Sequence, residues 1–156
     1  MSEQLDVVDE RLVRPDLSNV VAQRGSLVRV EVDDGRLTGF ALPEGFLLDV
    51  VFRGCRMDLA GFPFARLKRV TFEDCRLEEA DFRAAQLTDV RFERCDLTRA
   101  EFSNVRCVRT QIRQCVLDGL GGAGSLRGVA MTWEDVVAGA GLWAAAAGIT
   151  LLEADG

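Results

Sequence analysis

The residues best suited to chemistry in this chain are its cysteines, four of which recur at a fixed interval. Cys55, Cys75, Cys95 and Cys115 are spaced twenty residues apart, and Cys107 stands outside the series. Stacked thiols can bind a soft metal ion or form disulfides. Zinc sites, however, usually show close-set pairs such as C-x₂-C, which are missing here. Cysteine is also a compact residue that buries readily. We therefore interpret the series as core packing and predict no metal and no cofactor.

Other catalytic signatures are weaker still. The chain contains no His, which removes the commonest general acid–base residue and metal ligand. The acid pairs Glu73-Asp74 and Glu78-Glu79 could suggest hydrolysis or Ca²⁺ binding, but a solvated surface explains them better. No Gly-rich phosphate loop, nucleophile elbow or metal motif is present. We predict that the protein is not an enzyme and assign no catalytic residue.

These residues lie within a repeat of five. Every fifth residue from Leu17 to Leu117 is apolar, and from Cys55 onward the residue two before it is small or β-branched. The other positions are mostly polar. A period of five fits neither a helix nor a strand. A square coil with one five-residue side per face satisfies it, because each side then turns one large and one small residue inward.

A longer period of twenty supports the square coil. Val30, Val50, Val70 and Val90 recur at this spacing, as do two series of phenylalanines: Phe52, Phe72 and Phe92, and Phe62, Phe82 and Phe102. Twenty residues make one full turn of four sides. Like residues therefore stack in columns, about 4.8 Å apart if successive coils pair as parallel strands.

The segments Ala80-Asp81-Phe82-Arg83-Ala84, Cys95-Asp96-Leu97-Thr98-Arg99 and Ala100-Glu101-Phe102-Ser103-Asn104 resemble the A-(D/N)-L-x-x pattern of the pentapeptide-repeat family. The resemblance covers about residues 15–117. It implies an all-β fold, a right-handed quadrilateral β-helix. Residues 15–50 depart from the pattern, and we expect distorted first coils. There the small position is held by Pro15, Val20, Gly25, Gly35, Phe40 and Gly45.

Three segments are predicted along the chain. Residues 1–14 form an N-terminal lead-in, residues 15–117 a solenoid of about five coils, and residues 118–156 a flexible Gly-rich connector, a capping α-helix and a tail. Thr132 is the expected N-cap of a helix over Trp133–Ala147, with Asp135 completing an approximate capping box. Residues 149–152 are a candidate closing strand.

An exposed solenoid end requires a cap. The residues expected to cover the last coil, or to form a dimer contact, are Trp133, Leu142 and Trp143. Several members of the family dimerise through their C-terminal ends, so the resemblance implies a possible homodimer. Capping and dimerisation both stay open at this point.

Charge is unevenly spread along the chain. The net charge of −6 divides into −5 for residues 1–49, +3 for 50–117 and −4 for 118–156. On one predicted face the outward cations face only two acids, Asp49 and Asp89. The candidate partner-binding residues of this basic stripe are Arg29, Arg66, Lys68, Arg69, Arg106 and Arg109. The stripe could bind an acidic partner or nucleic acid, or serve solubility alone.

The function predicted from these features is a non-enzymatic interaction module that presents a rigid surface to a protein partner. The family resemblance implies an alternative, a DNA mimic that binds a type II topoisomerase such as gyrase and confers quinolone resistance. The basic middle weakens that alternative. Weak nucleic-acid binding by the stripe is a second alternative, disfavoured by the negative total. Because the chain lacks an apolar run of eighteen residues and an N-terminal signal peptide, we expect no membrane segment and a cytoplasmic location.

Overall fold

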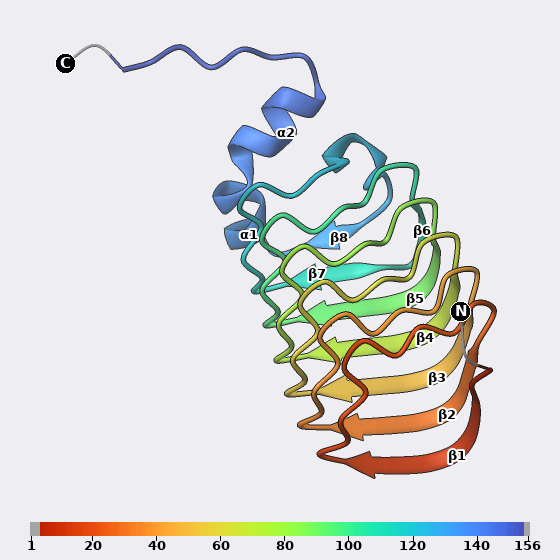
Figure 1. Ribbon diagram of the computed structural model, residues 1–156. Coiled ribbons are helices and arrows are strands. Elements are labelled where there is room, and N and C mark those ends of the chain that lie inside the picture. The colour runs from red at the N-terminus through yellow and green to blue at the C-terminus, as the bar shows by residue number, and fades with distance from the viewer. Residues whose placement is uncertain (1–3, 155–156) are drawn as a thin grey trace.

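The strands of this protein stack in one parallel sheet along a single axis (Figure 1). The computed structural model describes residues 4–154. The long strands are β1 (Asp6–Val13), β2 (Ser26–Asp33), β3 (Phe46–Arg53), β4 (Arg66–Glu73) and β5 (Gln86–Glu93). The last turns carry β6 (Arg106–Val108), β7 (Gln111–Arg113) and β8 (Ala130–Met131). Both β6 and β7 pair with β5.

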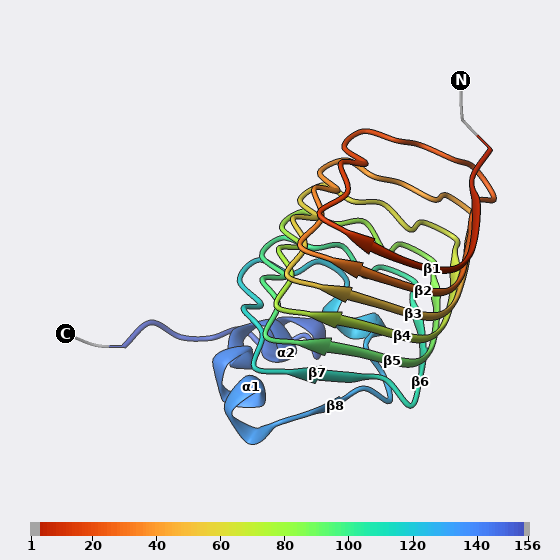
Figure 2. The same cartoon turned by 90° about the horizontal axis from the view of Figure 1, so that it is seen from below.

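Each coil pairs with the next at an offset of twenty residues. Leu27 pairs with Leu47, and Leu47 with Leu67. The remaining sides of the coil are held by single parallel bridges, such as Arg36 to Arg56. Figure 2 shows the open coil with this sheet on one side. The predicted right-handed quadrilateral β-helix is confirmed.

Phenylalanine fills the interior of the coils. Phe72 stacks between Phe52 and Phe92, with ring centroids 5.2 and 5.0 Å apart. Phe62 and Phe82 approach the same ring edge-on, at 6.1 and 5.8 Å. All five side chains are buried. The alternation of large residues predicted from the twenty-residue period therefore produces two interlocking aromatic columns.

The corners of the coil are built by residues with left-handed backbone. Asp49, Arg69 and Asp89 have φ angles of 56°, 53° and 55°. The same conformation recurs every five residues, mostly at charged or polar residues rather than glycine. It turns the chain from one side to the next, and it aims each corner side chain away from the core.

The solenoid begins earlier than the sequence analysis places it. Residues 1–14, predicted as a lead-in, contain β1, in which Val7 pairs with Leu27 and Leu12 with Val32. The five-residue spacing from Leu17 back to Leu12 and Val7 explains this extra turn, which gives about six turns in all. The first coils are also regular, contrary to expectation. Gly35 accommodates them, since a Cβ there would lie 2.6 Å from Leu37 Cδ1.

The solenoid also continues beyond Leu117. The Gly-rich segment predicted as a flexible connector forms a side of the last turn, where Gly121 N–H donates to Ala100 O at 2.9 Å. Leu120 and Leu126 are buried and hold this turn on the core. A short 3-10 helix, η1 (Ala123–Ser125), follows. The pairing of Ile112 with Met131 makes the final turn one residue shorter than the others.

Two short helices replace the single predicted one: α1 (Trp133–Ala138) and α2 (Ala140–Ala146). Thr132 caps α1 as predicted, accepting from Asp135 N–H at 3.2 Å. The break falls at Gly139, where a Cβ would lie 2.7 Å from Trp143 Cζ2. Trp143 folds back across this point and donates from Nε1 to Val136 O at 3.0 Å. Within residues 4–154 neither this region nor any other offers a helix able to cross a bilayer.

The end of the described chain is extended rather than paired. Residues 149–152, the candidate closing strand, form no strand. Figure 1 shows this segment leading away from the coils. Leu152 is 92% exposed. The tail therefore adds no coil to the stack.

Candidate binding surface

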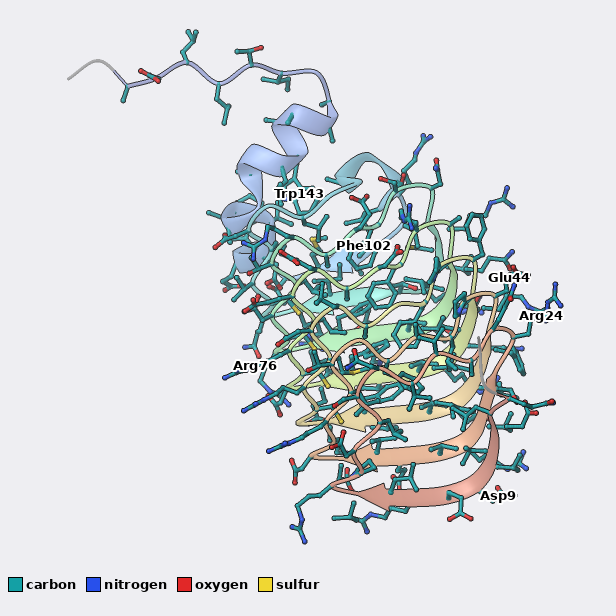
Figure 3. All side chains as sticks on the ribbon, viewed as in Figure 1. Asp9, Arg24, Glu44, Arg76, Phe102 and Trp143 are labelled. Carbon is teal, nitrogen blue, oxygen red and sulfur yellow. The ribbon has the colours of Figure 1, made fainter. Side chains whose placement is uncertain are left out.

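Acidic and basic residues alternate along one corner of the solenoid. We call this set the Asp–Arg column; its members are Asp9, Arg29, Asp49, Arg69, Asp89 and Arg109, one from each successive coil. All six have left-handed backbone, so their side chains leave the corner in the same direction. Figure 3 shows Asp9 on the outer surface, whereas Phe102 lies within the stack.

The column is a series of bidentate ion pairs. Arg109 donates from Nε and Nη2 to the two carboxylate oxygens of Asp89 at 2.7 and 3.1 Å. Arg69 pairs with Asp49 through the same two nitrogens, and Arg29 with Asp9. A planar guanidinium suits this geometry because its donors match a carboxylate side by side. In each pair Nη1 takes no part.

These pairs change the predicted basic stripe. Three of its six cations, Arg29, Arg69 and Arg109, are neutralised by an aspartate of the preceding coil. Arg66, Lys68 and Arg106 form no ion pair within the described residues. They lie beside the column on β4 and β6. The stripe is thus a balanced column flanked by three free cations, and not a continuous positive surface.

Hydrogen bonding to arginine lowers the pKa of Asp9, Asp49 and Asp89. A carboxyl group with a lower pKa in the folded state stabilises the fold above its unfolded pKa, which is 3.8. That contribution is lost as the pH falls through the folded pKa. Because these ion pairs lie at the surface, in contact with solvent, each effect is small.

We therefore expect the free energy of unfolding to decrease as the pH falls below about 4 and these carboxyl groups become protonated. Urea unfolding of the wild type and of Asp49→Asn between pH 6 and pH 2.5 measures it. The variant should lose less stability over this range, because one linked carboxyl group is gone. Parallel pH profiles for the two proteins would contradict the proposed linkage.

Several residues of this surface were not predicted from the sequence. Asp9 was placed in the lead-in, although it lies twenty residues before Arg29. Arg91 follows Asp89 on β5 and is exposed. Arg36, Arg56 and Arg76 form a second column on another side, where bridges join Arg36 to Arg56 and Arg56 to Arg76. The twenty-residue spacing was the available signal for all of them.

The four periodic cysteines lie in the core as predicted. Each thiol donates to two backbone carbonyls; that of Cys75 reaches Phe52 O and Glu73 O, both at 3.3 Å. All five cysteines are free. The adjacent Cys75 thiol and burial both raise the pKa of Cys55, and burial raises that of Cys107 to about 11. Such thiols are protonated at neutral pH and weakly nucleophilic.

Thiol labelling should follow this burial. We expect the native protein to react slowly with iodoacetamide at pH 8, with half-buried Cys107 modified before Cys75 or Cys95. All five cysteines should react at once in guanidinium. Mass spectrometry of labelled peptides at timed intervals gives the order. Rapid labelling of Cys75 in the folded protein would overturn the packing role.

The acid pairs lie on the surface between coils. Glu73 and Asp74 both accept from Arg94, at 2.7 and 2.9 Å. Glu79 accepts from Arg99 at 3.0 Å. Across residues 4–154 no three side chains of the types that ligate metals gather into a metal-sized group. Ion pairing between coils therefore accounts for most of these carboxylates.

The predicted cap contacts divide into two sets. Leu142 and Trp143 pack against the core as expected of a cap, and Figure 3 shows Trp143 above the last coil. Trp133, by contrast, is 76% exposed. It is the first residue after the N-cap Thr132 and lies on the side of the helix that faces solvent. Its role as a cap is not supported. The residue of this helix that contacts the last coil is Asp135, which is buried.

Comparison with known proteins agrees with this architecture. A profile of the pentapeptide repeat region matches residues 46–121. The sequence matches no curated protein.

Solved structures align only distantly. QnrB1, described as a plasmid-mediated fluoroquinolone resistance protein, is 14% identical over 88% of this chain and 99% of its own, with a TM-score of 0.39. Rfr23 from the cyanobacterium Cyanothece 51142 is 17% identical over 72% and 87% of the two chains, with a TM-score of 0.36. The profile match, the five-residue register and the four-sided coil together identify the chain as a member of the pentapeptide repeat protein family.

Proposed function

We propose that this protein is a non-enzymatic interaction module whose solenoid presents side chains at fixed spacing to a protein partner. The observation that carries the proposal is the constant twenty-residue register from β1 to β5. Such a register fixes outward side chains in straight columns about 4.8 Å apart. A preformed surface of this kind loses little conformational entropy when it binds.

The contact proposed on this surface consists of the free cations beside the Asp–Arg column. Arg66 and Lys68 lie on β4, and Arg106 lies two coils later on β6, with Gln86 at the register position between Arg66 and Arg106. Arg66 is held in place, since its guanidinium carbon lies 5.4 Å from the centre of the Phe46 ring. A partner with acidic side chains complements these charges.

Affinity capture from a lysate of the source organism tests whether the protein binds a partner through these cations. We expect a specific protein to be enriched by the wild type and lost with the triple change of Arg66, Lys68 and Arg106 to Gln. The matched control changes Arg36, Arg56 and Arg76 to Gln, which removes the same charge from another side. Equal capture by all three proteins would contradict the proposed contact. A reproducible activity on a small substrate, abolished by a surface substitution, would contradict the non-enzymatic role.

A second candidate is a DNA mimic that binds a type II topoisomerase. The observation in its favour is the pairing within the Asp–Arg column, which leaves no continuous positive stripe along the middle of an acidic protein. Supercoiling by gyrase at excess protein tests it, and an unaffected reaction removes it. The same pairing argues against direct binding of nucleic acid by the stripe. A gel shift of duplex DNA at low salt tests that alternative, and an unshifted duplex removes it.

The C-terminal end is proposed as a homodimer contact. Trp133 and Val137 on α1 are 76% and 55% exposed, and exposed apolar groups of this size mark interfaces. Light scattering after size exclusion should give twice the chain mass for the wild type and a monomer for Trp133→Glu. A wild-type monomer at high concentration would contradict the dimer.

A further inference from the structure

A groove runs beside the Asp–Arg column where β5 meets β7. It encloses about 600 Å³, within the range of small-molecule sites. Its polar lining comes from three neighbouring coils and consists of Arg69, Thr71, Asp89, Arg91, Arg109, Thr110 and Gln111. In the following turn the wall is made by Gly128 and Ala130, whose small side chains leave this end of the groove open.

Three arginines share this groove. Arg91 is exposed and forms no ion pair within the described residues. Arg69 and Arg109 leave the coils on either side, and each is oriented by its aspartate through Nε and Nη2. Because Nη1 of both groups takes no part in those pairs, it can donate to a ligand. The pairs therefore orient two cations without using all of their donors.

Neutral donors complete the lining. Thr71 and Gln111 are the direct neighbours of Arg91 in the strand pairing, one on each side. A hydroxyl, a guanidinium and an amide thus stand in one row facing the two oriented arginines. Three arginines against Asp89, and against Asp49 that pairs with Arg69 from outside the lining, give the groove a net charge of +1.

The equivalent groove in the first coils has the opposite character. It encloses about 580 Å³ along the same column. Arg11, which pairs with Asp33, lies there at the strand position that Arg91 holds four coils later. Its lining carries four carboxylates, from Asp9, Glu10, Glu31 and Asp49, against three arginines. Concavity is therefore a general property of this corner, whereas positive charge is confined to the C-terminal groove.

We propose that the C-terminal groove binds a phosphate monoester, with Arg91 as its central ligand. Such a group carries a charge of about −1.5 to −2 at neutral pH and three acceptor oxygens, which suit the positive sign of the groove and its several donors. A carboxylate offers only two oxygens and a single charge. This inference concerns small-ligand chemistry and does not depend on the proposed protein partner.

Calorimetric titration with glycerol phosphate, in phosphate-free buffer at low salt, tests the site. We expect saturable binding by the wild type and a loss of about 10- to 100-fold in affinity for Arg91→Gln, the usual effect of removing a hydrogen-bonded charge. Arg11→Gln makes the same change in the equivalent groove and should leave the affinity within about twofold. Circular dichroism of each variant verifies folding.

An equal loss of affinity for Arg11→Gln and Arg91→Gln overturns the proposal, as does the absence of saturable binding of both glycerol phosphate and a phosphoserine peptide by the folded wild type. A phosphoserine peptide carries the same group on a protein chain. Tighter binding of the peptide than of glycerol phosphate identifies a phosphorylated partner as the source, and the reverse order identifies a free metabolite. Failure of both ligands rejects the site while leaving the interaction module untouched.

Discussion

Phe72→Ala is expected to lower the free energy of unfolding by about 3–5 kcal/mol, the usual cost of deleting a buried aromatic side chain. The ring has no exposed surface and stacks between Phe52 and Phe92 at 5.2 and 5.0 Å. Its removal leaves a cavity that two neighbouring coils cannot close, because their spacing is fixed by backbone hydrogen bonds. Aromatic pairing adds about 0.5–1.5 kcal/mol per contact beyond burial.

Phe64→Ala is the matched control for this experiment. It deletes the same side chain from a corner of the solenoid, where Phe64 is 66% exposed. Surface changes of this kind cost about 0.5 kcal/mol or less. Urea unfolding of both variants, followed by circular dichroism, compares them. Similar midpoints for the two variants would show that the aromatic columns contribute little to stability.

The position of Phe72 in the central coils predicts a second effect. Coils of a solenoid contact only their neighbours, so a weakened central coil divides the stack into two parts. We expect the unfolding transition of Phe72→Ala to broaden, with a lower dependence on urea than in the wild type. Hydrogen exchange should then show the coils on the two sides of Phe72 losing protection separately. A single sharp transition shifted to lower urea would instead show that the stack unfolds as one unit.

The core was predictable because it obeys one rule along most of the chain. An apolar residue every five positions must return to the axis, so Leu47 and Phe72 could be assigned inward without coordinates. The outward columns obey no such rule. Asp89 and Arg109 pair because the left-handed backbone at the corner directs both side chains the same way. The periodicity of the sequence does not predict this backbone conformation. The sequence therefore indicated the charged residues of the stripe but not the pairing of its arginines with aspartates of the preceding coils.

The ends of the solenoid were harder to predict for a different reason. At the start of the chain, Val7 and Leu12 keep the five-residue spacing, but polar residues around them obscure it. At the other end the final turn is one residue shorter, and glycines resemble a linker although Gly121 pairs with the coil before it. The break at Gly139 depends on its close contact with the ring of Trp143. Helix propensities of single residues do not predict such a contact.

Asp135→Ala is the second substitution with a large expected effect. In the inner coils, a corner N–H donates to the carbonyl of the following coil, as Arg94 N–H does to Arg113 O at 2.9 Å. The turn that follows Gln114 leaves the stack after β8 as helix α1, so no such carbonyl stands opposite Gln114. Asp135 supplies the missing acceptors, since its carboxylate accepts from Gln114 N–H at 2.8 Å and from Cys115 N–H at 3.1 Å. It also accepts from the Thr132 hydroxyl at 2.6 Å.

Asp135→Ala leaves the buried N–H of Cys115 and the partly buried N–H of Gln114 without an acceptor, at about 1–3 kcal/mol for a buried group. We expect a total loss of about 2–4 kcal/mol and early loss of hydrogen-exchange protection in the last coil. Asp135→Asn keeps the shape and one acceptor oxygen but turns an N–H₂ toward the second donor, so its loss should be intermediate. Glu134→Ala, an exposed change in the same helical turn, is the control. If it destabilises as much as Asp135→Ala, helix α1 and not the carboxylate caps the solenoid.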